Sequence, residues 1–152
     1  MLEIEKGENM ETILLVEDDK NISNTVSYYL QSKGYGIYTA KTVKEAIEKM
    51  RCHAYDLLLL DINLPDGTGY DVYQEMKTIQ EIPTIFLTAL DEEKDIVKGF
   101  DLGADDYITK PFHAGELLSR IKNVIRHNLK KEKQEKIEIK HVEINYTLRK
   151  GF

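Results

Sequence analysis

The sequence predicts a doubly wound α/β domain, in which helices cover both faces of a parallel sheet. Five short apolar runs are spaced between residues 13 and 108, and helical patterns separate them. The runs do not alternate polar and apolar residues, which is typical of strands buried on both faces of a parallel sheet. Because strands and helices alternate along the chain, right-handed crossovers should join successive strands.

The five runs define the expected strands, at residues 13–16, 37–40, 57–60, 85–87 and 107–108. Between them, apolar residues recur at helical spacing, at 22/26/29/30, 43/46/47/50, 72/76/79, 96/97/100 and 117/118/121/124/125/129. Thr42 and Glu45 form a candidate capping box at the start of the second helix. Thr68 is a candidate cap of the third helix, and Asp91 precedes the fourth.

Composition excludes several classes of protein. The chain has 152 residues, of which 41% are hydrophobic and 32% charged, so it can form a core and is not disordered by composition. Its longest apolar run, 57–60, is far shorter than the roughly 20 residues of a membrane-spanning helix. The start has no apolar segment of the signal-peptide type, so we expect a cytoplasmic protein. A single cysteine, Cys52, excludes an internal disulfide and a cysteine-based zinc cluster.

Charge is unevenly distributed, with a net charge of −12 over residues 1–119 and +6 over residues 120–152. After a leader at 1–10, the domain should occupy 11–129, followed by a wholly polar segment at 130–136 that is a linker or the frayed end of a helix. Alternating apolar residues predict one or two strands within 137–152, a segment too short to build its own core. The basic tail could contact nucleic acid, but a solvated helix face is the commoner role of such a segment.

Polar side chains follow four of the expected strands. Glu17 and Asp18 follow the first, Asp61 the third, Thr88 ends the fourth and Lys110 follows the fifth. Open α/β sheets bind ligands beyond the carboxyl ends of their strands, so these groups should meet at one edge. Carboxylates held together repel each other, and a divalent cation relieves the repulsion. Mg²⁺ prefers such oxygen ligands and pairs one or two carboxylates with a phosphate.

This arrangement suits phosphoryl transfer to Asp61. A carboxylate can act as a nucleophile and form an acyl phosphate. Thr88 offers a hydroxyl and Lys110 a positive charge to the phosphoryl oxygens. Taken singly, each residue has a simpler role: the acidic run 17–19 as a helix cap, Asp61 as a turn residue, Thr88 as a cap and Lys110 as a surface lysine. The joint arrangement at four strand ends favours the phosphoryl site.

Four ordered motifs resemble those of response-regulator receiver domains, and they extend over about residues 11–128. The motifs are 13–19 (ILLVEDD), 56–67 (DLLLLDINLPDG), 85–89 (IFLTA) and 103–112 (GADDYITKPF). The last motif resembles the OmpR/PhoB-type subfamily. The resemblance implies a flavodoxin-like (βα)5 fold with strand order 2-1-3-4-5.

The resemblance also assigns roles to individual residues. Asp61 is implied as the phosphoacceptor, and Glu17 and Asp18 as the acid pair that binds Mg²⁺. The backbone carbonyl of Asn63 is a further implied metal ligand. The remaining implied roles are a switch hydroxyl at Thr88, a switch aromatic at Tyr107 that turns inward on phosphorylation, and a phosphate-pairing lysine at Lys110 with a cis bond to Pro111.

The partners implied are a histidine kinase and a second copy of the chain. The dimer would use the surface of the fourth helix, fifth strand and fifth helix, with Asp105, Asp106, Glu116 and Arg120 at matching positions. Ile96 departs from the pattern, because an arginine often occupies its place. Residues 137–152 resemble the first strands of a winged-helix DNA-binding domain without its recognition helix, so this chain itself should not read a DNA sequence. No membrane partner is expected.

Two other functions compete with a receiver that controls transcription. An aspartate-nucleophile phosphohydrolase usually has a second aspartate two residues after the nucleophile, and Asn63 stands there instead. A stand-alone receiver or phosphorelay module without DNA output would use the same site. A pseudo-receiver that is never phosphorylated typically loses the acceptor or the acid pair, which this chain retains. We therefore expect a signalling domain and not an enzyme.

Overall fold

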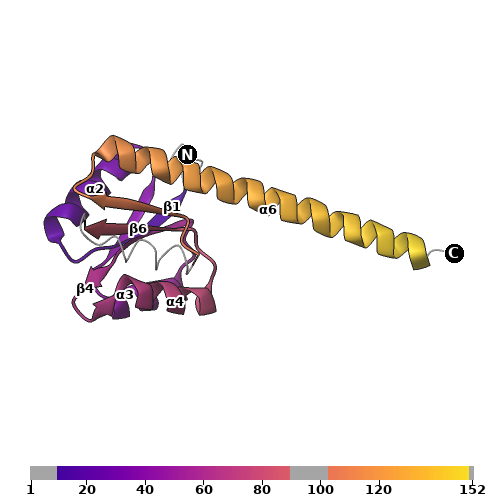
Figure 1. The fold of residues 1–152 in the computed structure, drawn as a ribbon, viewed down its shortest axis with the longest axis horizontal. Coiled ribbons are helices and arrows are strands. Elements are labelled where there is room, and N and C mark those ends of the chain that lie inside the picture. The colour runs from indigo at the N-terminus through magenta and orange to yellow at the C-terminus, as the bar shows by residue number, and fades with distance from the viewer. Residues whose placement is uncertain (1–9, 90–102, 151–152) are drawn as a thin grey trace, which may run out of the picture.

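A five-stranded parallel sheet forms the centre of the molecule (Figure 1). The structure is a computed structural model that describes residues 10–89 and 103–150, except the side chains of 138–150. The strands are β1 (Thr12–Val16), β2 (Gly36–Ala40), β3 (Leu57–Asp61), β6 (Thr84–Ala89) and β7 (Asp106–Lys110). Their order is β2-β1-β3-β6-β7, which confirms the predicted flavodoxin-like order with β6 and β7 as its fourth and fifth strands.

The helices form a layer on each face of the sheet, with α3 (Val43–Cys52) and α4 (Gly69–Ile79) on one face and α2 (Lys20–Ser32) and α6 (Ala114–Lys150) on the other (Figure 1). Alternate strand residues face opposite layers, so Leu58 packs toward α3 and α4 while Leu59 packs toward α2 and α6. All four leucines of β3 are completely buried, as the continuous apolar run predicted. Burial of each stabilises the fold by roughly 1.5–3 kcal/mol.

Helix caps differ in detail from the sequence prediction. Asp19 caps α2 by accepting hydrogen bonds from the backbone N–H groups of Asn21 and Ile22. Thr42 accepts from the N–H of Glu45, but the Glu45 carboxylate accepts from Lys41 N–H and not from Thr42, so the predicted capping box is only half formed. A complete capping box occurs instead on α4, where Thr68 and Asp71 bond reciprocally.

A short hairpin that the sequence analysis did not predict joins β3 to α4. It consists of β4 (Asn63–Leu64) and β5 (Gly67–Thr68), which pair antiparallel. Asp66, at its tip, accepts hydrogen bonds from Val43 N–H at 2.7 Å and Lys44 N–H at 3.1 Å. These are two of the N–H groups that have no partner within α3, so the hairpin caps a helix that starts 23 residues earlier. The loop after the candidate nucleophile is thereby fixed to α3.

Residues 130–136 are helical, and residues 137–150 form no strand, because α6 continues as a helix to Lys150 and extends beyond the domain (Figure 1). The segment 116–150 contains no glycine or proline, and its lysines, glutamates and glutamine favour helix. A strand needs a neighbour to satisfy its backbone groups, and the described part of the chain supplies none for this segment. No described helix is long and apolar enough to cross a membrane. The helix expected after Asp91, with Ile96, lies outside the described residues.

Candidate functional site

Three carboxylates meet at the carboxyl edge of the sheet, where the sequence predicted them. Glu17 and Asp18 follow β1, and Asp61 ends β3, the strand next to β1. One ligand oxygen from each carboxylate lies within 4.8 Å of the other two. Glu17 is 1% exposed and Asp61 7% exposed, whereas Asp18 is open to solvent. The cluster therefore has a buried floor and one accessible side.

Lys110 supplies the positive charge of the site. It ends β7, and its Nζ lies 3.0 Å from Glu17 Oε1, 3.2 Å from Glu17 Oε2 and 3.4 Å from Asp61 Oδ1. Burial lowers the pKa of Lys110, but the bonds to Glu17 and the charge of Asp61 outweigh burial and raise it. The amine therefore stays protonated between the two carboxylates. The peptide bond from Lys110 to Pro111 is cis, as the resemblance implied.

Glu17 is the most perturbed titratable group of the site. Burial and the neighbouring Asp61 together raise the pKa of Glu17 to about 8, although Lys110 partly offsets the rise. The folded chain thus holds an acid that prefers its neutral form, because ionisation would place a second negative charge beside Asp61. Perturbed groups of this kind are concentrated at functional sites.

The donor set of this cluster fits a hard divalent cation. Carboxylate oxygens are the ligands that Mg²⁺ prefers, and Mg²⁺ usually retains several waters. The solvent-exposed Asp18 leaves one side of the cluster open for such waters and for a phosphate. A cation between the three carboxylates would also relieve the repulsion that raises the pKa of Glu17. Glu17, Asp18 and Asp61 could therefore hold Mg²⁺.

Thr88 lies on β6, the strand beside β3, and Tyr107 lies on β7, the strand beside β6; both are buried. Thr88 is 1% exposed and Tyr107 is 6% exposed. The Tyr107 ring stacks on Phe86 with 5.4 Å between ring centroids. The sequence analysis expected Tyr107 to turn inward on phosphorylation, and its side chain already lies inside in this structure. The residues thus occupy the expected strands, while their part in a switch stays a prediction.

Gly69 sets the backbone geometry of the nucleophile, and the sequence analysis, which identified only the neighbouring Thr68 as a candidate helix cap, did not predict its role. Its N–H donates to the carbonyl of Ile62 at 2.7 Å. A Cβ atom at Gly69 would lie 2.4 Å from the backbone oxygen of Asp61. Only glycine permits this approach of α4 to the end of β3. Asn63, the implied carbonyl ligand, lies in β4 between these residues.

The residues expected to bridge a dimer form bonds within the chain. Arg120 Nη1 donates to both carboxylate oxygens of Asp106, at 2.9 and 3.1 Å, and Arg120 Nε lies 3.4 Å from Glu116 Oε1. Asp105 accepts a hydrogen bond from the backbone N–H of Thr84 at 2.8 Å. A dimer that uses these residues would share or exchange these bonds. Dimerisation therefore stays a prediction.

Comparison with known proteins identifies the family. A match to the response regulator receiver domain extends over residues 13–122. The chain belongs to the response regulator receiver domain family. Receiver domains of response regulators are signalling domains and not classical enzymes.

Individual relatives agree with this assignment. The cell cycle response regulator CtrA of Brucella ovis is 38% identical over 115 residues, which are 75% of this chain and 50% of that protein. The chain thus spans about half the length of the curated relatives it matches. The non-phosphorylated HemR receiver domain of Leptospira biflexa is 40% identical, with a TM-score of 0.71 over 76% of this chain and 94% of that one. A CheY-like receiver protein from Methanospirillum hungatei has a TM-score of 0.76 at 29% identity, over 80% of this chain and 98% of that one.

Proposed function

We propose that this receiver domain accepts a phosphoryl group on Asp61 from a histidine kinase in a Mg²⁺-dependent reaction. One observation carries the proposal: the carboxylate of Asp61 lies within a cluster of two further acids and is 3.4 Å from a protonated Lys110. Three acids gathered at a partly buried site are costly to desolvate, and a purely structural role does not explain why they are placed together. The roles that the matching residues have in receiver domains support the same function.

The chemistry follows from the positions of these groups. An oxygen of Asp61 attacks the phosphorus of a phosphohistidine, the phosphorus–nitrogen bond breaks, and the imidazole leaves with the electron pair of that bond. The product is an acyl phosphate on Asp61. Glu17, Asp18 and Asp61 would hold Mg²⁺, which would supply positive charge to the phosphoryl oxygens. Lys110 is placed to pair with another of these oxygens, exchanging its bond to Asp61 for one to the phosphoryl group.

A groove beside the site offers room for a protein donor. It has a volume of about 460 Å³ and is lined by Ile22 and Val26 of α2 and by Lys110, Pro111 and Phe112 after β7. The lining is mostly apolar, which suits packing against a helix of a kinase more than binding of a small charged donor. Its position next to Lys110 would bring a phosphohistidine to Asp61.

The output is proposed from the resemblance to OmpR/PhoB-type regulators. Phosphorylation would draw Thr88 to the phosphoryl group and keep Tyr107 inside, which would stabilise one state of the surface around β7 and α6. That surface would form a symmetric dimer through Asp105, Asp106, Glu116 and Arg120. Transcription would be controlled through a DNA-binding domain of the full-length protein, in keeping with the match of this chain to about half the length of a cell cycle response regulator. A cytoplasmic location of the protein stays a prediction.

Incubation with acetyl phosphate and Mg²⁺, followed by intact-mass measurement, tests the proposed function. We expect one phosphoryl adduct in the wild-type chain, none in Asp61→Asn, and none when EDTA replaces Mg²⁺. An adduct that persists in Asp61→Asn would place the chemistry elsewhere. Sedimentation with and without beryllofluoride tests the dimer, and a monomer in both conditions would contradict the proposed output.

A further inference from the structure

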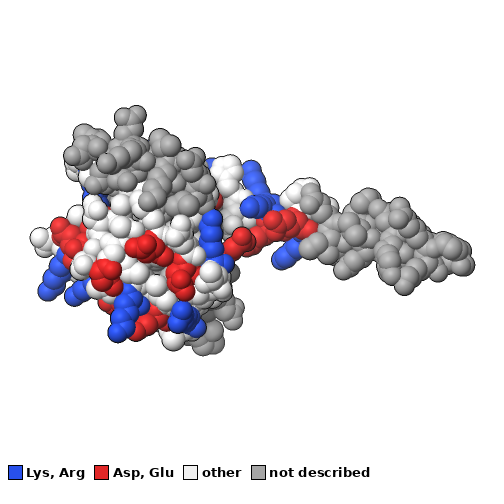
Figure 2. Space-filling view, turned by 60° about the horizontal axis from the view of Figure 1, so that its bottom comes forward, with Lys and Arg blue, Asp and Glu red and all other residues white. Residues whose placement is uncertain are grey.

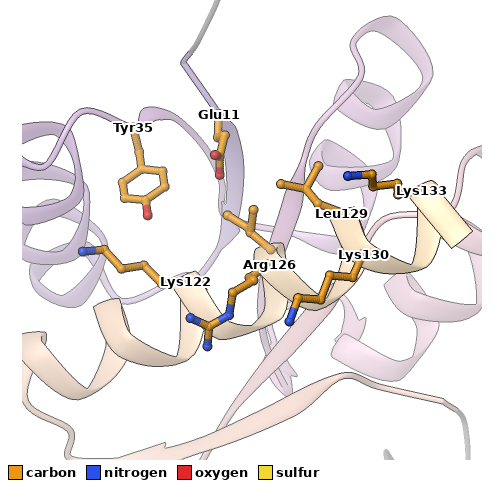
Figure 3. Close-up of a pocket in the computed structure, with 8 residues that line it drawn as sticks. Glu11, Tyr35, Lys122, Arg126, Leu129, Lys130 and Lys133 are labelled. Atoms are coloured by element: carbon orange, nitrogen blue, oxygen red, sulfur yellow. The ribbon is translucent and has the colours of Figure 1, made fainter.

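A second concave surface lies at the opposite end of the sheet from Asp61. It is a groove of about 350 Å³ between α6 and the segments that lead into β1 and β2 (Figure 3). Tyr35 and Glu11 line it on the side of the sheet, and α6 contributes Ile125, Leu129 and a row of basic side chains. The proposed phosphorylation chemistry uses none of these residues.

The basic row consists of Lys122, Arg126, Lys130 and Lys133, which are spaced four, four and three residues apart. This spacing places them along one face of the helix, and Figure 3 shows the four side chains along the groove. All four are exposed, and none forms an ion pair within the part of the chain that the structure describes. One acid, Glu11, borders the same groove. The groove therefore carries an excess of positive charge.

This single-sign row contrasts with the rest of the described surface. Over the layer of α3 and α4, basic and acidic side chains are interspersed (Figure 2). There Lys49 pairs with Glu45 and Arg51 with Glu75. On α6, Glu132 lines an adjoining groove with Asp56 and Glu81, and the two grooves share Glu11, Ile125 and Leu129. The groove beside Tyr35 thus contains four basic side chains and one acid.

Exposed apolar side chains accompany the basic row. Leu129 is 57% exposed and lies within it, and Ile137, one turn beyond Lys133, is 55% exposed. Among the described residues, these are the large hydrophobic side chains of α6 that are mostly open to solvent. Ile125 and the ring of Tyr35 continue the apolar surface into the groove. The result is an apolar strip bordered by cations.

We propose that this groove docks an acidic amphipathic helix of a partner protein. Leu129 and Ile125 would receive an apolar side chain of that helix, and the basic row would pair with its carboxylates. Duplex nucleic acid offers phosphates but no aliphatic side chain for the apolar strip. An anionic bilayer is flat and would leave the concave floor of the groove empty. Both the charge and the shape therefore favour an acidic helix.

Docking here goes beyond the proposed function and is independent of it, because the groove and Asp61 lie at opposite ends of the sheet. The test uses the full unphosphorylated chain and a fluorescein-labelled helical peptide with glutamates on one face and leucines on the other. A scrambled peptide of the same composition is the control probe. We expect fluorescence anisotropy to show at least about tenfold tighter binding of the amphipathic peptide.

Variants locate the binding surface. The charge-reversed double variant Arg126→Glu/Lys130→Glu should bind the amphipathic peptide at least about tenfold more weakly. The matched control Lys41→Glu/Lys44→Glu reverses two exposed lysines at the start of α3, on the other face of the sheet, and should stay within about twofold of wild type. Circular dichroism and the urea midpoint establish that both variants are folded.

Three results would overturn the proposal. The first is equal affinity for the amphipathic and scrambled peptides. The second is unchanged peptide binding in the folded variant Arg126→Glu/Lys130→Glu. The third is tighter binding to phosphatidylserine vesicles or to duplex DNA than to the peptide, which would assign the groove to a membrane or to nucleic acid. Loss of phosphorylation at Asp61 would have no bearing on these measurements.

Discussion

Replacement of Glu17 by glutamine should abolish the proton release that accompanies Mg²⁺ binding. Glu17 is almost completely buried beside Asp61, and its pKa is raised to about 8. At pH 7, which lies below this pKa, Glu17 is mostly protonated in the absence of a cation. Because a cation at the cluster stabilises the ionised carboxylate, Mg²⁺ binding at pH 7 should release protons from the wild-type chain. Glutamine carries no such proton.

The same pKa fixes the pH dependence of affinity and of stability. The apparent association constant for Mg²⁺ should fall as the pH falls below about 8, because protons then compete with the cation for Glu17. Without Mg²⁺, the folded chain binds a proton that the unfolded chain, with an ordinary glutamate pKa, has already released. The contribution of Glu17 to the free energy of unfolding therefore decreases as pH rises from about 4.5 to 8.

Calorimetric titration with Mg²⁺ at pH 7, in two buffers of different ionisation enthalpy, counts the protons released. Glu48→Gln, which changes an exposed glutamate on α3, is the matched control and should release as many protons as the wild type. Glu17→Gln should release close to none and should bind Mg²⁺ with a flat pH profile between 6 and 8. Equal proton release by Glu17→Gln and the wild type would refute the reasoning.

Three further predictions follow from packing and helix capping. Phe86→Ala removes a completely buried ring that contacts three tyrosine rings, and it should lower the free energy of unfolding by about 3–5 kcal/mol in urea titrations. Gly69→Ala places a Cβ against the backbone of Asp61 and should slow phosphorylation by acetyl phosphate at least about tenfold. By contrast, Gly115→Ala meets no atom within 4 Å and should stabilise α6 by about 0.5–1 kcal/mol. Asp66→Ala removes the acceptors for the first two N–H groups of α3, so the urea midpoint of this variant should fall. The midpoint of Asp66→Asn should fall less. An unchanged midpoint in Asp66→Ala would show that the hairpin does not cap α3.

The sheet and the site could be predicted because both depend on local sequence patterns. The run 57–60 is continuously apolar, and a strand in the middle of a parallel sheet requires that. Since parallel strands end at the same edge, the acids after β1 and β3 had to meet once the sheet was assigned. Glu17, Asp61 and Lys110 are therefore together as expected.

Other features depend on contacts between distant segments and could not be read in this way. The caps that Asp66 provides to α3 and the close approach of Gly69 to Asp61 appear only when the hairpin is folded. The segment 137–150 alternates as a strand would, yet it forms part of α6. Alternation indicates a strand only where a neighbouring strand is present, and high helix propensity decides the structure where none is.

The most direct test of the account is to locate the phosphoryl group. After incubation with acetyl phosphate and Mg²⁺, reduction with borohydride converts an aspartyl phosphate to homoserine, and peptide mass spectrometry identifies the residue. We predict homoserine at position 61 in the wild-type chain and its absence when Mg²⁺ is removed. Homoserine at another aspartate, or an unmodified Asp61 at saturating Mg²⁺ and donor, would contradict the assignment of this site.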